Sequence, residues 1–249
     1  MRLRLDSSEL SVMRRRSFSI HAEASDINPV TSVWQDTVDM ATPVDQIWYA
    51  SYGSNMSLRR LNYYLVGGRP PAGALTYPGC RDNTPPRQSV AIMMPGEMYF
   101  AMDALAWSGG MAFYDPDEVG EIPARAHLIS VAQFADIAAQ EMCTQPGADL
   151  DLSAVLAGER VALGGGCYET MLCAGSMNGI SILTFTAPWR SSDARLNSPS
   201  PIYIRHLAAG LIEGHDWSIV EIAAYLSSRP GAVGKWTQAA IIDLISDLA

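Results

Sequence analysis

The sequence predicts an α+β protein in which helices are interspersed among strands, rather than a parallel array of repeated β-α-β units. Two observations support this prediction. Apolar runs of strand length, separated by many short connections, fill much of the region from residue 47 to residue 129. Helical spacing of apolar residues appears around residues 131–142 and again from residue 202 onward. This order of elements is typical of the α+β class.

The first organised element is the apolar run Ile47–Tyr52, which predicts a buried strand. Ser57 then offers an N-cap for a short helix over residues 58–66. Proline and glycine dominate residues 69–86 and predict a long structured loop. Four further strands are expected, at residues 89–94, 98–102, 110–114 and 124–129.

A capping-box pattern, Ser130-x-x-Gln133, predicts a helix over residues 131–142. Two strands are expected next, at residues 168–174 and 180–186. Asn178-Gly179 favours a tight hairpin between them, because both residues tolerate positive φ. Three helices should complete the chain, at residues 202–213, 218–227 and 237–248.

Residues 1–45 differ from the rest, with a basic run at Met13–Ser17 followed by polar residues without clear periodicity. We expect a disordered extension or a start codon assigned too far upstream, with Met13 and Met40 as alternatives. Several acidic residues disfavour a transit peptide. Residues 46–228 are expected to form the main domain, and residues 229–249 a C-terminal helix.

Composition excludes several classes of function. The formal net charge of −9 argues against a dedicated nucleic-acid binder, which needs clustered Lys and Arg. No stretch approaches the roughly 18 consecutive apolar residues of a membrane helix. The 4 cysteines lack the paired CxxC spacing of a zinc site. No apolar segment follows the N-terminal charges as in a signal peptide. We therefore expect a cytoplasmic protein without a metal, and without a nucleic-acid or membrane partner.

The first candidate for chemistry is Tyr52-Gly53-Ser54-Asn55-Met56, between a predicted strand and a predicted helix. A glycine here lets the backbone turn and lets a ligand approach without meeting a Cβ. The amides that follow lie at a helix N-terminus, which favours an anion such as a carboxylate. Ser54 and Asn55 add side-chain donors. The segment is therefore either an anion-binding turn or a plain tight turn.

The second candidate is Glu141, near the end of the helix predicted at residues 131–142. Its spacing from Phe134 and Ala138 places it along the apolar face, whereas Asp136 is expected to project toward solvent. A carboxylate on an apolar face is costly unless it is paired or its pKa rises. A raised pKa suits a group that shuttles protons near neutral pH. The alternative is that Glu141 turns outward as the helix frays.

Other residue types give weaker signals. The 4 histidines form no metal-binding spacing. Ser54 is not in a G-x-S-x-G elbow, so the sequence does not support a serine nucleophile. Gly164-Gly165-Gly166 lacks the Lys-Ser/Thr of a phosphate loop and predicts a flexible turn.

Taken together, the motifs resemble the γ-glutamylcyclotransferase-like family. The turn is similar to the family's Tyr-Gly-Ser-Asn-Leu/Met signature, and Glu141 falls where the family carries its catalytic glutamate. Two further segments resemble the family's tryptophan–glycine segment and its late Pro-Ser-x-x-Tyr segment: Trp107–Ala112, and Pro199–Tyr203 followed by Leu207 and Gly210. The resemblance covers about residues 47 to 215.

This resemblance implies a compact mixed β-barrel flanked by helices, with C-terminal helices added. It implies cyclotransfer without metal or cofactor, in which the α-amine of a small-molecule γ-glutamyl amide attacks its own γ-carbonyl and releases 5-oxoproline. Glu141 would be the catalytic acid/base. The substrate-binding residues would be Tyr52, Gly53, Ser54, Asn55, Met56 and Tyr203. Phe185 stands near the place of a further family tyrosine, so one hydroxyl of the usual site is missing.

Two alternatives to cyclotransfer stay open. One is hydrolysis or deprotection of a γ-glutamyl amide in a biosynthetic pathway. The other is a non-catalytic binding module on the same fold, since fold and motif do not establish turnover. The apolar C-terminal helix around residues 239–248 either packs on its own domain or forms a homodimer contact.

Overall fold

The structure, a computed structural model, describes residues 45–71, 73–104 and 108–248 of the chain. These residues contain the following strands: β1 (Gln46–Ser51), β2 (Gln88–Pro95), β3 (Glu97–Ala101), β4 (Met111–Asp115), β5 (Glu121–Ser130), β6 (Val161–Ala162), β7 (Thr170–Met177) and β8 (Ile180–Thr186). The helices are α1 (Leu58–Val66), α2 (Val131–Glu141), α3 (Ser153–Leu156), α4 (Pro201–His215), α5 (Ile219–Ser227) and α6 (Gln238–Ile245). Single 3-10 turns are η1 (Ser54–Met56), η2 (Ser191–Asp193) and η3 (Ser246–Leu248).

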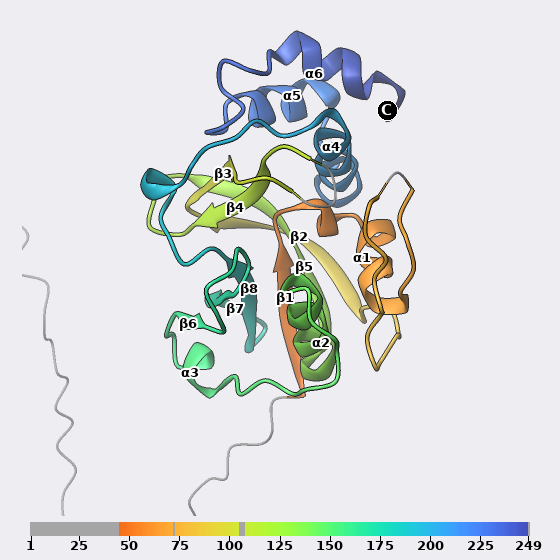
Figure 1. Cartoon of the computed structure of the whole chain (residues 1–249), viewed down its shortest axis with the longest axis vertical. Coiled ribbons are helices and arrows are strands. Elements are labelled where there is room, and N and C mark those ends of the chain that lie inside the picture. Colours follow the sequence, from red (N-terminus) through yellow and green to blue (C-terminus); the bar gives the residue numbers. More distant parts are fainter. Residues whose placement is uncertain (1–44, 72, 105–107, 249) are drawn as a thin grey trace, which may run out of the picture. The chain divides into compact units, whose positions relative to one another are not determined.

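A mixed sheet of six strands, in the order β2-β5-β1-β8-β7-β6, forms the centre of the described part (Figure 1). Neighbours pair antiparallel except for β1 and β8, which run parallel. The sheet curls into a half-barrel, and β3 and β4 form a separate antiparallel ladder. The predicted α+β class, with a mixed sheet flanked by helices, is confirmed.

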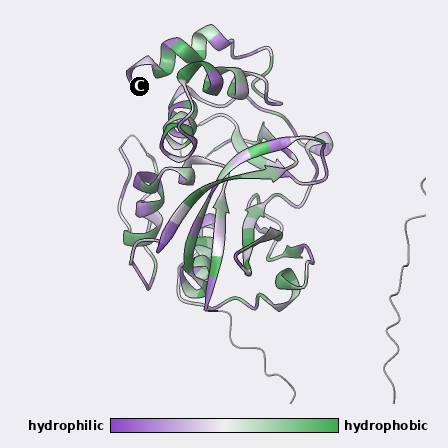
Figure 2. Ribbon diagram, turned by 180° about the vertical axis from the view of Figure 1, so that it is seen from behind, coloured by the Kyte–Doolittle hydropathy of each residue, from purple (hydrophilic) through white to green (hydrophobic). Residues whose placement is uncertain are grey.

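β1 is buried on both faces, which explains its continuous apolar run. Successive side chains of a strand point to opposite faces. Trp48 and Ala50 accordingly join a core with α4, α5 and α6, whereas Ile47 and Tyr49 join a second core with α1, α2 and α3. Figure 2 shows hydrophobic residues running along the strands and through the C-terminal helices. The strand therefore ends in the middle of the fold, between two groups of helices.

Most predicted elements are present with small shifts at their ends. The hairpin between β7 and β8 is confirmed, because Asn178 and Gly179 both have positive φ, 53° and 76°. The capping box of α2 forms as predicted. Ser57 is the N-cap of α1, but its side chain makes no capping hydrogen bond. The short elements α3, β6 and η1 were not predicted, since each is too brief to show periodicity.

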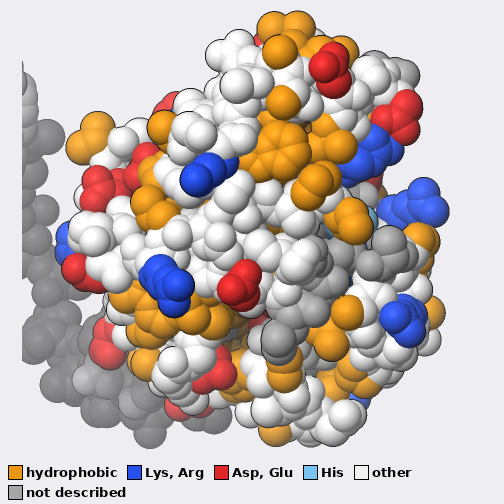
Figure 3. All heavy atoms as spheres, turned by 45° about the horizontal axis from the view of Figure 1, so that its top comes forward, with side chains coloured by type: hydrophobic (Ala, Val, Ile, Leu, Met, Phe, Trp, Pro, Cys, Tyr) orange, Lys and Arg blue, Asp and Glu red, His pale blue; other side chains and the backbone are white. Residues whose placement is uncertain are grey.

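Some predictions lie outside the described residues. They concern residues 1–44 and Trp107 of the tryptophan–glycine segment. Within the described ranges, no helix combines the length and the apolar character needed to cross a membrane. On the face drawn in Figure 3, Lys and Arg side chains are scattered among acidic ones and do not gather in one patch.

Helix α4 packs directly on the turn that follows β1. A Cβ on Gly210 would lie 2.7 Å from the Cβ of Met56, which is closer than side chains pack, so only glycine permits this approach. Tyr203 lies seven residues earlier in α4 and therefore on the same face of the helix. Close packing at Gly210 thus brings Tyr203 to the end of β1, where the candidate site lies.

Candidate active site

A cavity of about 300 Å³ opens where β1 ends. Its lining comes from widely separated parts of the chain, namely the turn at residues 52–55, helix α1, the end of α2, strand β8 and helix α4. Glu141 lies in the same cavity as Tyr52, Gly53, Ser54 and Asn55. A concave site with a few polar groups on mainly apolar walls is the usual form of a small-molecule site.

The turn is held from behind by polar contacts to its backbone. His127 Nε2 is 3.0 Å from the carbonyl oxygen of Asn55, and Arg125 donates to that of Met56 at 3.0 Å. Glu213 accepts from the amide of Leu58 at 3.1 Å and pairs with Arg125 at 2.6 Å. Glu213 thus caps α1 in place of the Ser57 side chain. Because these carbonyls are bonded on the core side, the turn has a fixed position.

His127 is fully buried. Ser89 Oγ lies 2.8 Å from Nδ1, and Nε2 lies beside the Asn55 carbonyl. Burial lowers the pKa of His127 to about 4, so the ring is neutral at physiological pH. A neutral ring has one N–H, which it donates to the Asn55 carbonyl while Nδ1 accepts from Ser89. Its place is behind the turn, outside the cavity lining.

Gly53 does not need the conformational freedom of glycine. Its φ of −104° and ψ of −152° are accessible to other residues. A Cβ there would lie 3.5 Å from the Tyr203 hydroxyl, which is ordinary contact. What Gly53 provides is the space that a side chain would occupy between the turn and Tyr203. Among the described residues, no acceptor is bonded to the backbone N–H groups of Gly53 and Ser54.

Glu141 reaches the turn from the last residue of α2. Its Oε1 lies 3.5 Å from Nδ2 of Asn55. Burial raises the pKa of Glu141 above its usual value, while Tyr64 and then Arg60 act in the opposite direction. The side chain therefore follows the inward alternative and does not fray outward. Its carboxyl has the protonation behaviour expected of an acid/base group.

Asn55 is almost fully buried between the turn and Glu141. Its Nδ2 is also 3.5 Å from the hydroxyl of Tyr49. Its Oδ1 has no hydrogen-bond partner among the described residues. A buried acceptor without a partner is costly.

Tyr203 lines the cavity, with its hydroxyl accepting from the amide of Ala112 at 3.2 Å. Tyr52 also lines the cavity, but its hydroxyl donates to the carbonyl of Phe185 at 2.8 Å. Met56 is placed in the core under α4 and is not among the cavity residues. Phe185 does line the cavity, so a phenyl ring stands where the resemblance led us to look for a hydroxyl.

Sequence reasoning missed several residues of this site: Tyr49, Arg60, Tyr64, Tyr77 and Tyr168. Arg60 is buried, donates to the Tyr77 hydroxyl, and has its guanidinium carbon 5.0 Å from the Tyr64 ring centroid and 4.6 Å from that of Tyr77. A signal existed for Arg60 and Tyr64. They lie four residues apart beside Leu61 and Leu65, on the buried face of α1.

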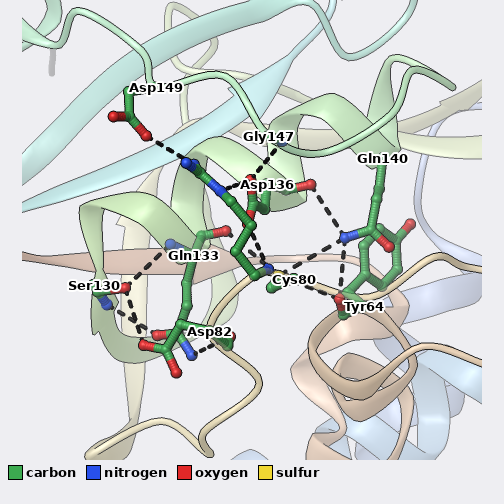
Figure 4. Close-up of polar contacts among 10 residues, drawn as sticks. Tyr64, Cys80, Asp82, Ser130, Gln133, Asp136, Gln140, Gly147 and Asp149 are labelled. Carbon is green, nitrogen blue, oxygen red and sulfur yellow. Dashed lines mark hydrogen bonds and ion pairs between the residues drawn. The ribbon is translucent and has the colours of Figure 1, made fainter.

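The prediction that Asp136 faces solvent was wrong. Its side chain is 0% exposed and accepts from Arg81 through the backbone amide at 2.8 Å and through Nε at 3.0 Å. The amide of Gly147 donates to it at 3.2 Å (Figure 4). Two loops, one before β2 and one after α2, cover the side of α2 that its sequence pattern marks as polar. The periodicity of the helix sequence does not reveal burial by loops from elsewhere in the chain.

Gln140, next to Glu141, joins α2 to α1. Its amide donates to the carbonyls of Tyr64 at 3.0 Å and of Asp136 at 3.1 Å (Figure 4). Tyr64 also lines the cavity and acts to lower the pKa of Glu141. The contacts of Gln140 therefore fix the relative position of the helices that carry Tyr64 and Glu141. Within the described residues, no group of three or more His, Cys, Asp or Glu side chains is suited to a metal ion.

Comparisons with known proteins give distant likenesses. No protein-family model matches the chain. Histone deacetylase 5 of Arabidopsis thaliana is 28% identical over 224 residues, which are 82% of this chain and 33% of that protein. The chain thus spans about a third of the length of the curated relative it matches.

Two solved structures are similar in fold. A gamma-glutamyl cyclotransferase is 14% identical with a TM-score of 0.46, covering 82% of this chain and 99% of its own. An uncharacterized human protein is 15% identical with a TM-score of 0.46, covering 81% and 99%. At these levels the comparisons assign the chain neither an activity nor a substrate.

Proposed function

We propose that the chain cleaves γ-glutamyl amides by cyclotransfer, releasing 5-oxoproline and a free amine or amino acid. This proposal rests on the short distance between the Glu141 carboxyl and Asn55 of the turn. The carboxyl, with a pKa raised by burial, lies 3.5 Å from Asn55 inside the cavity that Gly53 and Ser54 also line. A carboxyl that can both take and return a proton beside an anion-binding turn suits this reaction.

In this reaction the α-nitrogen of the glutamyl group bonds to the γ-carbonyl carbon, and the π electrons move to the carbonyl oxygen. When the carbonyl re-forms, the bond to the leaving nitrogen breaks. The α-nitrogen loses a proton and the leaving nitrogen gains one, so one carboxyl can serve both steps. Glu141 has this role. Because both reacting groups belong to the substrate, holding the chain folded supplies much of the rate.

Gly53, Ser54 and Asn55 of the turn bind the substrate. The N–H groups of Gly53 and Ser54 bind the α-carboxylate of the glutamyl group, in the way that exposed amides bind anions. The amide of Asn55, which lines the cavity beside Glu141, turns its unpartnered Oδ1 toward the α-amine and accepts a hydrogen bond from it. The contacts of His127 and Arg125 behind the turn keep these groups in place.

The first test is 5-oxoproline release from a panel of γ-glutamyl amino acids and γ-glutamyl amines, followed by mass spectrometry. Glu141→Gln is expected to lower kcat by about 10²- to 10⁴-fold, the usual contribution of a general acid/base. Glu159→Gln changes an exposed carboxylate outside the cavity and is the matched control.

Product identity separates the alternatives. Glutamate in place of 5-oxoproline would replace cyclotransfer by hydrolysis. Binding of a γ-glutamyl amide without any turnover would indicate a binding module. Equal rates for Glu141→Gln and the parent would remove Glu141 from the mechanism.

A further inference from the structure

The hydroxyl of Tyr203 lies close to Gly53 of the turn, in the same cavity. Tyr203 is buried, and its Oη is 3.5 Å from the point that a Cβ on Gly53 would occupy. The space between them is lined by Gly53 on one side and by this hydroxyl on the other. A ligand atom that enters this space meets the phenol directly.

The hydrogen bonds around Tyr203 show which proton remains available. Tyr203 Oη accepts from the Ala112 amide at 3.2 Å, and the Tyr168 hydroxyl donates to the Ala112 carbonyl at 2.6 Å. A phenol has one proton. The proton of Tyr168 is used at the carbonyl, and Tyr203 only accepts in its bond with the Ala112 amide, so its own proton can turn toward a ligand.

Neighbouring tyrosines are already engaged. The hydroxyl of Tyr52 donates to the carbonyl of Phe185, and that of Tyr168 donates to the carbonyl of Ala112. Tyr203 differs because its backbone partner is a donor. An N–H that donates to a phenol oxygen withdraws electron density and makes its O–H a better donor.

We infer that the Tyr203 hydroxyl donates a hydrogen bond to the γ-carbonyl oxygen of the substrate. This hydrogen bond becomes stronger as that oxygen becomes an oxyanion. This inference rests on the proposed function. As the α-nitrogen bonds to the carbon, the π electrons pass to the oxygen and the negative charge develops beside Tyr203. When the bond to the leaving nitrogen breaks, the electrons return to the carbonyl. The Tyr203 proton stays on its oxygen throughout.

The surroundings of Tyr203 suit this role. Burial raises its pKa to about 12, with the Ala112 amide acting in the opposite direction, so the hydroxyl keeps its proton at neutral pH. Ala112 is fixed in the β4 ladder opposite Phe100, and Ser200 caps the helix that carries Tyr203. A donor held in place before the charge develops stabilises it without reorganisation.

Tyr203→Phe tests this inference in the 5-oxoproline assay. We expect kcat to fall by about 10²-fold, as for other single oxyanion donors, with a much smaller change in KM. Tyr225→Phe is the matched control, because it removes a partly buried tyrosine hydroxyl whose bond is to the Met98 sulfur at 3.8 Å, outside the cavity lining. Its kcat should equal that of the parent.

A γ-thioamide substrate, in which sulfur replaces the γ-carbonyl oxygen, separates a hydrogen-bonding role of Tyr203 from a structural one. Sulfur is a weak hydrogen-bond acceptor, so the exchange removes the proposed hydrogen bond from the substrate side. The parent should be slowed by the oxygen-to-sulfur exchange, and Tyr203→Phe should show almost no further slowing. If Tyr203→Phe does not fold, 3-fluorotyrosine at position 203 keeps the shape and makes the hydroxyl more acidic. The alkaline limb of kcat should then move to lower pH.

The outcomes separate this inference from the proposed function. The parent could release 5-oxoproline while Tyr203→Phe has the same kcat and the same slowing by the γ-thioamide. This result would overturn the role of Tyr203 and leave the proposed function standing. An unmoved alkaline limb in the fluorinated protein would do the same. A folded parent that releases 5-oxoproline from no substrate would overturn the cyclotransfer proposal and this role with it.

Discussion

At the scale of single residues, the site is built from groups that are costly to bury. Glu141, Arg60 and Asn55 occupy a cavity with tyrosine walls, and the Asn55 Oδ1 has no partner among the described residues. Functional sites often retain such costs because a ligand, rather than the fold, completes their hydrogen bonds. Glu141 is the clearest case, since burial acts against its charged form.

Glu141→Gln should therefore raise the thermal stability at alkaline pH while it lowers kcat. The folded pKa of Glu141 lies above the ordinary value of 4.5, so the folded chain binds a proton more tightly than the unfolded chain. Stability consequently falls as pH rises from 4.5 through the folded pKa. Glutamine resembles the protonated form and escapes this loss. Its advantage in Tm over the parent should be present at pH 8 and vanish near pH 4.5.

Thermal melts across this pH range check the prediction, with Glu159→Gln as an exposed control outside the cavity. A Glu141→Gln variant less stable than the parent at every pH would contradict it. In the parent, kcat/KM should fall as pH is lowered through the same pKa, because the base must be ionised to accept a proton.

At the scale of elements, α2 is held on both sides. One side joins the core with Phe134 and Ile137, and the other carries Asp136, which binds Arg81 and the amide of Gly147 (Figure 4). These contacts tie the loop before β2 and the loop after α2 to the helix that ends at Glu141. A single buried carboxylate therefore orders two loops near the cavity.

Asp136→Asn should lower the free energy of unfolding by about 3 kcal/mol, because it leaves the donors of Arg81 and Gly147 poorly matched in a buried position. Asp149→Asn is the matched control. Asp149 binds the same Arg81 at 2.8 Å, but its side chain is 79% exposed, so its loss should cost about 1 kcal/mol or less. Urea titrations of both variants measure the difference. Equal losses of unfolding free energy in the two variants would show that Asp136 contributes no more than Asp149 to holding Arg81.

At the scale of the whole molecule, the sheet separates two cores that both reach the site. The turn and Tyr203 belong to the core with α4, α5 and α6, while Tyr49, Tyr64 and Phe185 belong to the core with α1, α2 and α3. The side chains Ile241 and Ile245 of α6 are fully buried in the first of these cores. Stability at the C-terminus and geometry at the cavity are therefore linked.

Ile241→Ala tests whether α6 unfolds with the rest of the chain. Truncating this buried side chain should cost about 2–4 kcal/mol in a single cooperative transition. Val220→Ala, which changes a side chain of α5 in a residue that is 58% exposed, should cost far less. Calorimetry of both variants measures these costs. Binding of a γ-glutamyl amide to the cavity is followed in parallel. A separate low-temperature transition for Ile241→Ala would mean that residues 229–249 form an independent unit.

The sequence by itself determined the features that depend on neighbours along the chain. The strand into Tyr52-Gly53, the capping box of α2 and the hairpin at Asn178-Gly179 follow from periodicity and turn chemistry, because those act over a few residues. Glu141 was placed inward for the same reason, from its spacing along α2. The roles of these residues in catalysis remain proposals.

Only the tertiary structure decided which distant groups meet. It buried Asp136 under two loops, brought Tyr168 from the segment before β7 to the Ala112 peptide, and set α4 against the turn at Gly210. None of these contacts leaves a local pattern, because each partner lies tens of residues away. The cavity is made by such contacts, so the sequence could predict its turn and its carboxyl but not its walls.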